Sequence, residues 1–218
     1  MAFNVAIDGP AGAGKSTIAK IVAKEKGFIY VDTGAMYRAM ALYFLKKGIR
    51  PEESDKISAA VDGADVTIEY VNGEQQVLLN GENVTPYLRT EEVGNMASVS
   101  SANADVRRKL VELQQKLAAT SDVVMDGRDI GTCVLPNADV KVYLTASSVV
   151  RANRRYKELI EKGQEADWDT IKKDIEERDY RDMNRDISPL RQAEDAILID
   201  SSDMTIEENV QAILNLMN

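Results

Sequence analysis

A glycine-rich segment, GPAGAGKS at residues 9–16, restricts the fold of this chain more than any other feature. An apolar run typical of a β-strand precedes it, and apolar residues recur after it at helical spacing. Its glycines permit backbone conformations and close approaches that a Cβ atom would forbid. Backbone N–H groups and the start of the helix then converge on one point, which favours an anion. The segment therefore predicts a phosphate-binding loop at the end of a buried strand.

The pattern G-x-x-x-x-G-K-S also predicts the roles of single residues. Lys15 is expected to contact the β- and γ-phosphates of a nucleoside triphosphate, and the Ser16 hydroxyl is expected to ligate Mg²⁺. The loop alone does not separate kinases from GTPase switches or motor ATPases. An Asn-Lys-x-Asp element is absent from the sequence, and so is the extra domain of a motor, which favours a small-molecule kinase. The predicted ATP-binding residues are Gly9, Pro10, Ala11, Gly12, Ala13, Gly14, Lys15, Ser16 and Thr17.

Apolar runs and helical segments alternate along the chain, which predicts an α/β fold with a parallel sheet covered on both faces. About ninety residues separate the second expected strand from the third, far more than a crossover helix needs. Alternating residues and two Asn-Gly pairs within this stretch, the first at Asn72-Gly73, predict a small antiparallel subdomain. A final helix, over 206–217, is expected to pack on the main sheet. The expected strands lie near 3–8, 28–32, 122–126, 140–144 and 196–200.

The composition excludes several classes of function. A net charge of −9 argues against a polynucleotide partner, because nucleic-acid binding depends on Lys and Arg. Histidine is absent, so chemistry must rest on Lys, Arg, Asp, hydroxyls and backbone amides. No apolar stretch reaches the roughly 18 to 20 residues of a membrane span, and the single Cys133 forms no internal disulfide. We therefore expect a cytoplasmic protein, and a monomer because no long apolar stripe or heptad is evident.

Arginine is concentrated in one part of this acidic chain, since seven of the thirteen arginines lie within residues 151–191. Ser147 or Ser148 is expected to cap a first helix that ends at Gly163, and a second helix follows. For Arg181 and Arg191, solvated pairing with nearby acids remains an equal alternative. The others are expected to contact phosphate, because guanidinium groups stabilise charge on a transferring phosphoryl group. These are Arg151, Arg154, Arg155, Arg178 and Arg185.

A second polar cluster follows the apolar run of VVMDGRDIGT at residues 123–132. Asp126 stands at the end of the expected strand, where phosphate-loop proteins commonly place the acid that holds Mg²⁺ directly or through water. Arg128 and Asp129 come next, in the crevice where ligands bind to parallel sheets. A turn stabilised by Asp side chains is the structural alternative.

Taken together, these motifs resemble those of the bacterial cytidylate kinase family over essentially the full length of the chain. The resemblance is carried by IDGPAGAGKS, DTGAMYR at 32–38, VMDGRDIGT at 124–132, ASSVVRANRR at 146–155 and ERDYRDMNRDISPL at 177–190. It implies a P-loop NTPase core with a five-stranded parallel sheet flanked by helices, an inserted NMP-binding subdomain and a helical lid. It also implies that ATP, with Mg²⁺, phosphorylates CMP and dCMP.

The resemblance further implies a role for each acceptor-binding residue. Thr33 and Asp182 would contact the sugar, with Asp32 beside them. Arg38, Arg128 and Arg185 would bind the acceptor phosphate. The cytosine would be read by Ser98, Arg107 and Asp129, because cytosine presents an amino donor beside a ring-nitrogen acceptor. The full predicted CMP-binding set is Asp32, Thr33, Arg38, Ser98, Arg107, Arg128, Asp129, Asp182 and Arg185.

A single kinase domain is the expected organisation. Its core would comprise 1–38, 102–145 and 190–218, with the NMP-binding insert at about 39–101 and the lid at about 146–189. Catalysis would consist of positioning donor and acceptor in line while Lys15 and the arginines, Arg128 among them, neutralise charge. Two alternatives remain open from the sequence: a kinase for another small acceptor, such as UMP, AMP or shikimate, or a nucleotide-dependent binding switch.

Overall fold

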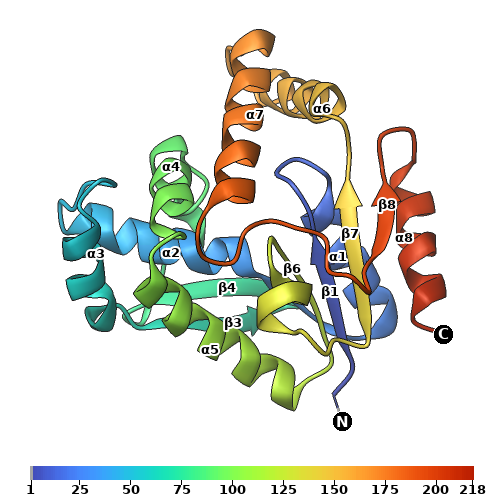
Figure 1. Ribbon diagram of the computed structural model, residues 1–218, viewed down its shortest axis with the longest axis horizontal. Helices are drawn as coiled ribbons and strands as arrows, with labels where there is room; N and C mark the ends of the chain where they lie inside the picture. Colours follow the sequence, from blue (N-terminus) through green and yellow to red (C-terminus); the bar gives the residue numbers. More distant parts are fainter. Residues whose placement is uncertain (1) are drawn as a thin grey trace. The chain divides into compact units, whose positions relative to one another are not determined.

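Five parallel strands form the main sheet of the computed structural model, which describes residues 2–218 (Figure 1). The strand order is β2-β6-β1-β7-β8, so β1 lies at the centre with β6 and β7 on either side. This confirms the predicted α/β fold. The strands are β1 (Asn4–Asp8), β2 (Ile29–Asp32), β6 (Val123–Gly127), β7 (Val140–Thr145) and β8 (Ile197–Asp200), each within two residues of its expected bounds.

The chain divides into two compact units. The first comprises residues 1–30 and 121–218, and it contains the predicted lid segment at about 146–189. The second comprises residues 31–120, and it contains the predicted insert at about 39–101. The functional boundaries of insert and lid stay predictions. Among residues 2–218 no helix combines the length and apolar character needed to cross a membrane.

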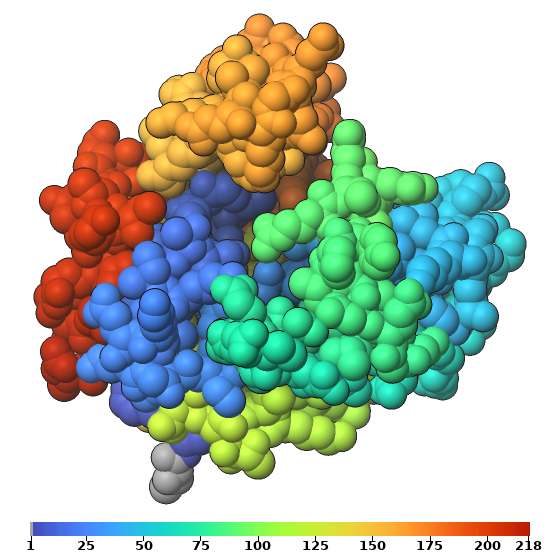
Figure 2. Space-filling view, turned by 180° about the vertical axis from the view of Figure 1, so that it is seen from behind, coloured from blue at the N-terminus to red at the C-terminus, as the bar shows by residue number. Residues whose placement is uncertain are grey.

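Helices of the first unit cover the sheet and extend beyond its carboxyl edge. Apolar side chains of α1 (Lys15–Lys26) and α8 (Ile206–Leu216) form one core with β1 and β7. The two helices contact each other, and Figure 2 shows them side by side in blue and red. Beyond the end of β7, α6 (Ser148–Glu161) packs against α7 (Trp168–Asn184). A π-helical turn, η3 (Ile130–Val134), follows β6.

The second unit combines a helical cluster with the predicted antiparallel sheet. In that sheet, β3 (Val66–Val71) pairs with β4 (Glu74–Leu79), which pairs with the short β5 (Glu82–Asn83). Asn72 and Asn80 have positive φ and each precedes a positive-φ glycine, as the Asn-Gly pairs predict. Its remaining elements are α2 (Thr33–Lys46), α3 (Ser54–Ala60), η1 (Val61–Gly63), η2 (Thr85–Tyr87), α4 (Glu91–Ser100) and α5 (Ala104–Thr120).

Candidate functional site

The glycine-rich loop lies between β1 and α1, as the sequence predicts. A Cβ at Gly9, where φ is +144°, would meet the Leu144 carbonyl oxygen of β7, so only glycine permits this approach. Gly12 (φ +78°) packs against the Arg151 side chain, and Gly14 (φ +93°) precedes the first residue of α1. The loop thus wraps the N-terminus of a helix, the arrangement that binds phosphate.

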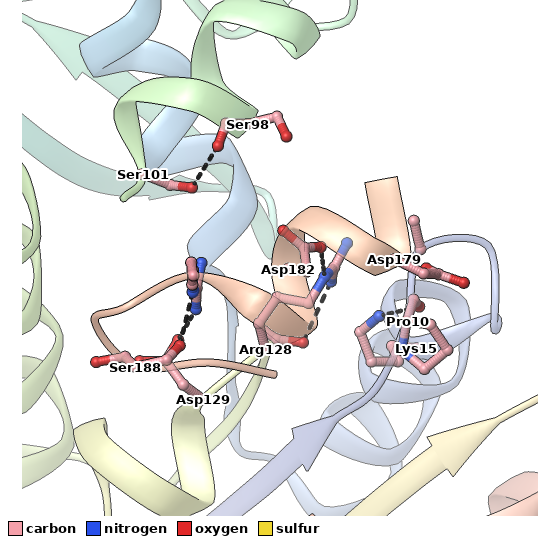
Figure 3. Close-up of polar contacts among 12 residues, drawn as sticks. Pro10, Lys15, Ser98, Ser101, Arg128, Asp129, Asp179, Asp182 and Ser188 are labelled. Atoms are coloured by element: carbon pink, nitrogen blue, oxygen red, sulfur yellow. Dashed lines mark hydrogen bonds and ion pairs between the residues drawn. The ribbon is translucent and has the colours of Figure 1, made fainter. Parts of the chain in front are cut away.

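Lys15 is buried at the start of α1, and its Nζ donates a hydrogen bond to the Pro10 carbonyl at 2.7 Å (Figure 3). Burial holds the pKa of the Lys15 amine well below its ordinary value, and the nearby positive charge of Arg128 lowers the pKa further. The carboxylates of Asp126 and Asp8 oppose this shift. The positive charge of this buried amine is only partly compensated by its neighbours, so the amine is suited to receive an anionic phosphate.

Asp126 is buried near the end of β6 and meets the loop through Ser16. The Ser16 hydroxyl donates to Asp126 Oδ2 at 2.9 Å, and the Tyr30 hydroxyl donates to Oδ1 at 2.8 Å. The structure therefore brings together the two residues predicted to hold a metal. Mg²⁺ commonly takes one or two protein oxygens and completes its octahedron with water and phosphate, so this donor set fits the ion.

Arg151 and Arg154 lie on α6, whose N-cap is Ser147, and both reach the glycine-rich loop. Arg151 donates to the Ala11 carbonyl at 2.9 Å and pairs with Asp179 of α7 at 2.5 Å. Arg154 donates to the Ala13 carbonyl at 3.4 Å and to Ser201 after β8. The space-filling view shows α6 and α7, in orange, above the dark blue loop (Figure 2). Both arginines thus support the loop through its carbonyls.

The other lid arginines differ in their surroundings. Arg155 is 49% exposed and pairs with Glu158 one turn along α6. Arg178 on α7 contributes positive charge to the surroundings of both Lys15 and Asp182. The predicted phosphate contacts of Arg151, Arg154, Arg155, Arg178 and Arg185 stay predictions.

A second group of site residues follows β6 and the end of α7. Arg128 Nε contacts Asp182 Oδ2 at 3.0 Å (Figure 3). Arg185 contacts Asp129 at 3.4 Å. Burial alone would raise the pKa of the Asp182 carboxyl, but Arg128, Arg178 and Arg185 outweigh it and hold that pKa below its ordinary value. These four predicted acceptor residues therefore lie together in two ion pairs within the first unit.

The remaining predicted acceptor residues belong to the second unit. Asp32 caps α2 by accepting from the Ala35 amide, and Thr33 is buried in its first turn. An added Cβ at Gly34 would lie 3.2 Å from Arg38, so glycine leaves room for that guanidinium. This helix start therefore gathers Asp32, Thr33 and Arg38.

Ser98 and Arg107 flank the turn between α4 and α5. Buried Arg107 donates to the Ser101 carbonyl at 3.3 Å, and its guanidinium lies 5.6 Å from the centre of the Tyr37 ring. The Ser101 hydroxyl donates to the Ser98 carbonyl (Figure 3), while the Ser98 hydroxyl is buried and has no hydrogen-bond partner among residues 2–218. A buried hydroxyl in this state calls for an explanation, and a ligand would supply one.

Three residues at these sites were not among the predicted site residues. Asp179 and Ser201 hold the arginines of α6, and Tyr37 faces Arg107. Asp179 stands one turn before a predicted site residue, which was a usable signal. Nothing in the local sequence marks Ser201, because its partners lie far away along the chain.

The chain is similar to known proteins over nearly its full length. The family model described as cytidylate kinase matches residues 5–218. Cytidylate kinase of Caldicellulosiruptor saccharolyticus is 53% identical, with 98% of this chain and 95% of the relative covered. Cytidylate kinases of Leuconostoc mesenteroides and Bacillus subtilis are 50% and 45% identical, over 99% and 97% of this chain and 96% and 95% of theirs.

Solved structures show the same fold at greater distance. A gluconokinase from Sinorhizobium meliloti superposes with a TM-score of 0.51 at 14% identity, covering 99% of this chain and 91% of its own. A sugar kinase from Janibacter gives a TM-score of 0.50 at 15% identity, covering 100% and 95%. These likenesses concern the fold alone. The full-length family match and the identities near 50% establish that the chain belongs to the cytidylate kinase family.

Proposed function

We propose that this protein transfers the γ-phosphoryl group of ATP to CMP and dCMP, giving ADP and the corresponding diphosphates. The observation that carries the proposal is the pair of polar centres in the first unit. The phosphate-binding loop with buried Lys15 follows β1, and the paired Arg128–Asp182 and Asp129–Arg185 groups follow β6, its neighbour in the sheet. Ligands of parallel sheets bind at the carboxyl ends of the strands.

Donor binding rests on the loop from Gly9 to Thr17. Its backbone N–H groups and the start of α1 would hold the phosphate oxygens, and Lys15 would exchange its hydrogen bond with Pro10 for one with a phosphate. Ser16 and Asp126 would hold Mg²⁺, directly or through water. When bound, the ion would neutralise charge on the donor phosphates.

Acceptor binding would begin with exchange of the ion pairs already present. Arg128 and Arg185, now paired with carboxylates, would bind the phosphate of CMP together with Arg38. Asp182, once its arginine turns to phosphate, would accept hydrogen bonds from the sugar hydroxyls. Thr33 is proposed to contact the sugar as well. Groups that are pre-paired with each other are already ordered, which lowers the entropic cost of binding.

Base recognition is assigned to Ser98, Arg107 and Asp129. The buried Ser98 hydroxyl and the Arg107 guanidinium offer hydrogen bonds to the ring edge, and a carboxylate can accept from the cytosine amino group. Uracil presents a carbonyl oxygen in place of that amino group. A carboxylate facing this oxygen would lose its hydrogen bond, which costs about 1–3 kcal/mol.

Catalysis would be positional, with no side chain forming a covalent bond. Lys15 and the arginines hold donor and acceptor in line and neutralise charge as the phosphoryl group moves. The helical lid of α6 and α7 brings Arg151, Arg154, Arg155 and Arg178 to the donor and excludes water. Because Arg151 and Arg154 already contact the loop, lid position and loop shape are coupled.

A panel of acceptors tests this function. Initial rates of ADP release with ATP and magnesium should be highest with CMP and dCMP, and much lower with UMP, AMP or shikimate. A preference for another acceptor would overturn the base assignment. Slow ATP hydrolysis that no acceptor stimulates would indicate a binding switch. The same material, in light scattering, should be monomeric, and fractionated cells should hold it in the cytoplasm.

A further inference from the structure

Asp8 is the last residue of β1 and directly precedes the phosphate-binding loop. Asp8 is 5% exposed, and its carboxylate accepts two hydrogen bonds from consecutive backbone amides. Asp8 Oδ1 accepts from Ile130 N and Oδ2 accepts from Gly131 N, both at 2.7 Å. Each oxygen therefore binds one amide, and the carboxylate joins the end of β1 to the turn that follows β6.

These amides belong to the first residues of the π-helical turn η3. The first amides of any helical turn lack partners within it, and here the turn's own bonds begin later. Cys133 N and Val134 N donate to the Asp129 carbonyl, and Leu135 N donates to that of Ile130. Asp8 thus supplies from another strand the cap that the turn lacks.

Glycine at position 131 leaves the space beside this amide open. A Cβ there would lie 3.4 Å from Asp8 Oδ2 and 3.2 Å from Cδ of Lys141. Lys141 has little freedom to move away, because its amine is buried and bonded to the Pro136 carbonyl and to Asp195. An added Cβ would therefore be crowded mainly by Lys141, and the backbone that carries the Gly131 amide would have to shift.

A buried carboxylate at this position is costly, so its retention needs a reason. Its predecessors in β1, Val5 to Ile7, are fully buried and apolar, and an apolar residue at position 8 would avoid the loss of hydration. The phosphate-loop pattern itself begins at Gly9 and does not require an acid before it. The two amide bonds to η3 are the contacts that account for it.

We propose that Asp8 is a positioning residue for acceptor recognition. Arg128 and Asp129 directly precede the two amides, and the Asp129 carbonyl closes the turn. By fixing Ile130 and Gly131, Asp8 sets the backbone from which Arg128 and Asp129 reach Asp182 and Arg185. The inference rests on the proposed function and adds a residue that does not touch the acceptor.

Steady-state kinetics of Asp8→Asn test the proposal. The amide side chain offers one oxygen and one NH₂ group to two N–H donors, so one of the two bonds is lost and the turn shifts. The Michaelis constant for CMP should rise about tenfold or more, and the preference for CMP over UMP should fall. The Michaelis constant for ATP should stay within about twofold. Gly131→Ala should act in the same direction.

Asp139→Asn is the matched control. Asp139 accepts from the Asn4 amide at 2.8 Å, so it makes the same type of bond at the opposite end of β1. This exposed residue lies outside the proposed machinery, and its replacement should leave both Michaelis constants unchanged. An unchanged constant for CMP in Asp8→Asn, or an equal rise for ATP, would overturn the proposal. An equal rise for ATP would indicate that Asp8 acts on Lys15 and the donor loop instead.

Amide exchange of the unaltered protein provides a readout that does not depend on the folding of a variant. The Ile130 and Gly131 amides should exchange slowly and shift together when Asp8 titrates, and rapid exchange would contradict the clamp. If the unaltered protein prefers an acceptor other than CMP, the proposed function fails. The same variants then report on that acceptor, and an unchanged Michaelis constant for it would reject the role of Asp8.

Discussion

Two loops follow neighbouring strands of the same sheet, and they are held in opposite ways. The glycine-rich loop after β1 is held through its carbonyls, which accept from Lys15, Arg151, Arg154 and Ser201. The turn after β6 is held through its amides, which donate to Asp8. Support from the carbonyl side leaves the first loop's amides for phosphate. Support from the amide side leaves the second loop to bind with its side chains.

The difference follows from the ligands proposed for each loop. A triphosphate is an anion that many convergent N–H groups can bind, whatever base it carries. An acceptor nucleotide must be distinguished from close analogues, which requires side chains with different donors and acceptors. In this account the donor loop binds with its backbone, and the acceptor loop binds with Arg128 and Asp129.

The largest effect should come from Lys15, the donor-loop side chain proposed to contact phosphate. Lys15→Met should lower kcat by on the order of 10³-fold, because it removes a charge used in the transition state. The Michaelis constant for CMP should change far less. Coupled-assay kinetics at saturating CMP would measure kcat, and rates at varied CMP would give its Michaelis constant. A variant that lost CMP binding alone would contradict the separate roles of the two loops.

Removal of Arg151, which donates to a carbonyl of the glycine-rich loop, should destabilise the protein. Arg151→Met leaves the Asp179 carboxylate buried without its partner, and we expect a loss of about 3 kcal/mol in the free energy of unfolding. Denaturant unfolding would measure it. Arg151→Met should also raise the Michaelis constant for ATP, because the loop loses a contact. The double variant with Asp179→Asn should recover part of the lost stability, while this Michaelis constant stays raised. Full recovery of both would show that Arg151 does not support the loop.

The hydrogen bonds from the turn after β6 to Asp8 should make the stability of the protein depend on pH. Burial raises the pKa of Asp8 from 3.8 to about 6, Asp129 adds to the rise, and the two amides and Lys15 oppose it. Between pH 3.8 and about 6, Asp8 keeps a proton in the native protein that it has released in the unfolded chain. The free energy of unfolding therefore falls as the pH rises through this range. Relative to Asp8→Asn, the free energy of unfolding of the unaltered protein should fall by on the order of 3 kcal/mol between pH 4 and pH 7.

Unfolding curves at several pH values would measure this difference. The subtraction of one protein from the other removes the opposite trend from Asp182, whose lowered pKa contributes stability that is lost only as the pH falls below 3.8. A difference that does not vary with pH would mean that the folded protein does not hold the pKa of Asp8 above that of the unfolded chain.

The smallest effect on stability is expected at Arg155, on the exposed side of α6. Its ion pair with Glu158 is half exposed, so Arg155→Ala should change the free energy of unfolding by less than about 1 kcal/mol. Any fall in kcat would then report contact with the donor. Unchanged turnover, measured beside a stability curve, would remove Arg155 from the lid arginines.

The sequence predicted those features that depend on local patterns. Apolar runs located the strands of the main sheet to within two residues, and the Asn-Gly pairs located both turns of the small sheet. Of the two serines expected as a helix cap, Ser147 and Ser148, the structure has Ser147. The motif placed Lys15, and the position of Asp126 at the end of a strand placed it beside Ser16. Each of these signals arises from neighbours in the chain.

Partners that are distant in sequence could not be predicted in this way. The spacing of Arg151 and Arg154 indicated one helix face, but it did not show that loop carbonyls would meet that face. Asp8 is an acid at the end of an apolar strand, and its two amides lie more than a hundred residues away. Only the pairing of β1 with β6 brings them together.

Amide and side-chain NMR signals, followed in one titration series, test the contrast between the two loops most directly. A non-hydrolysable ATP analogue should shift the backbone amides of Gly12 to Lys15. CMP should shift the guanidinium signals of Arg128 and Arg185 and leave the Ile130 and Gly131 amides protected on Asp8. Strong shifts or deprotection of those two amides with CMP, or unmoved loop amides with the ATP analogue, would contradict the account.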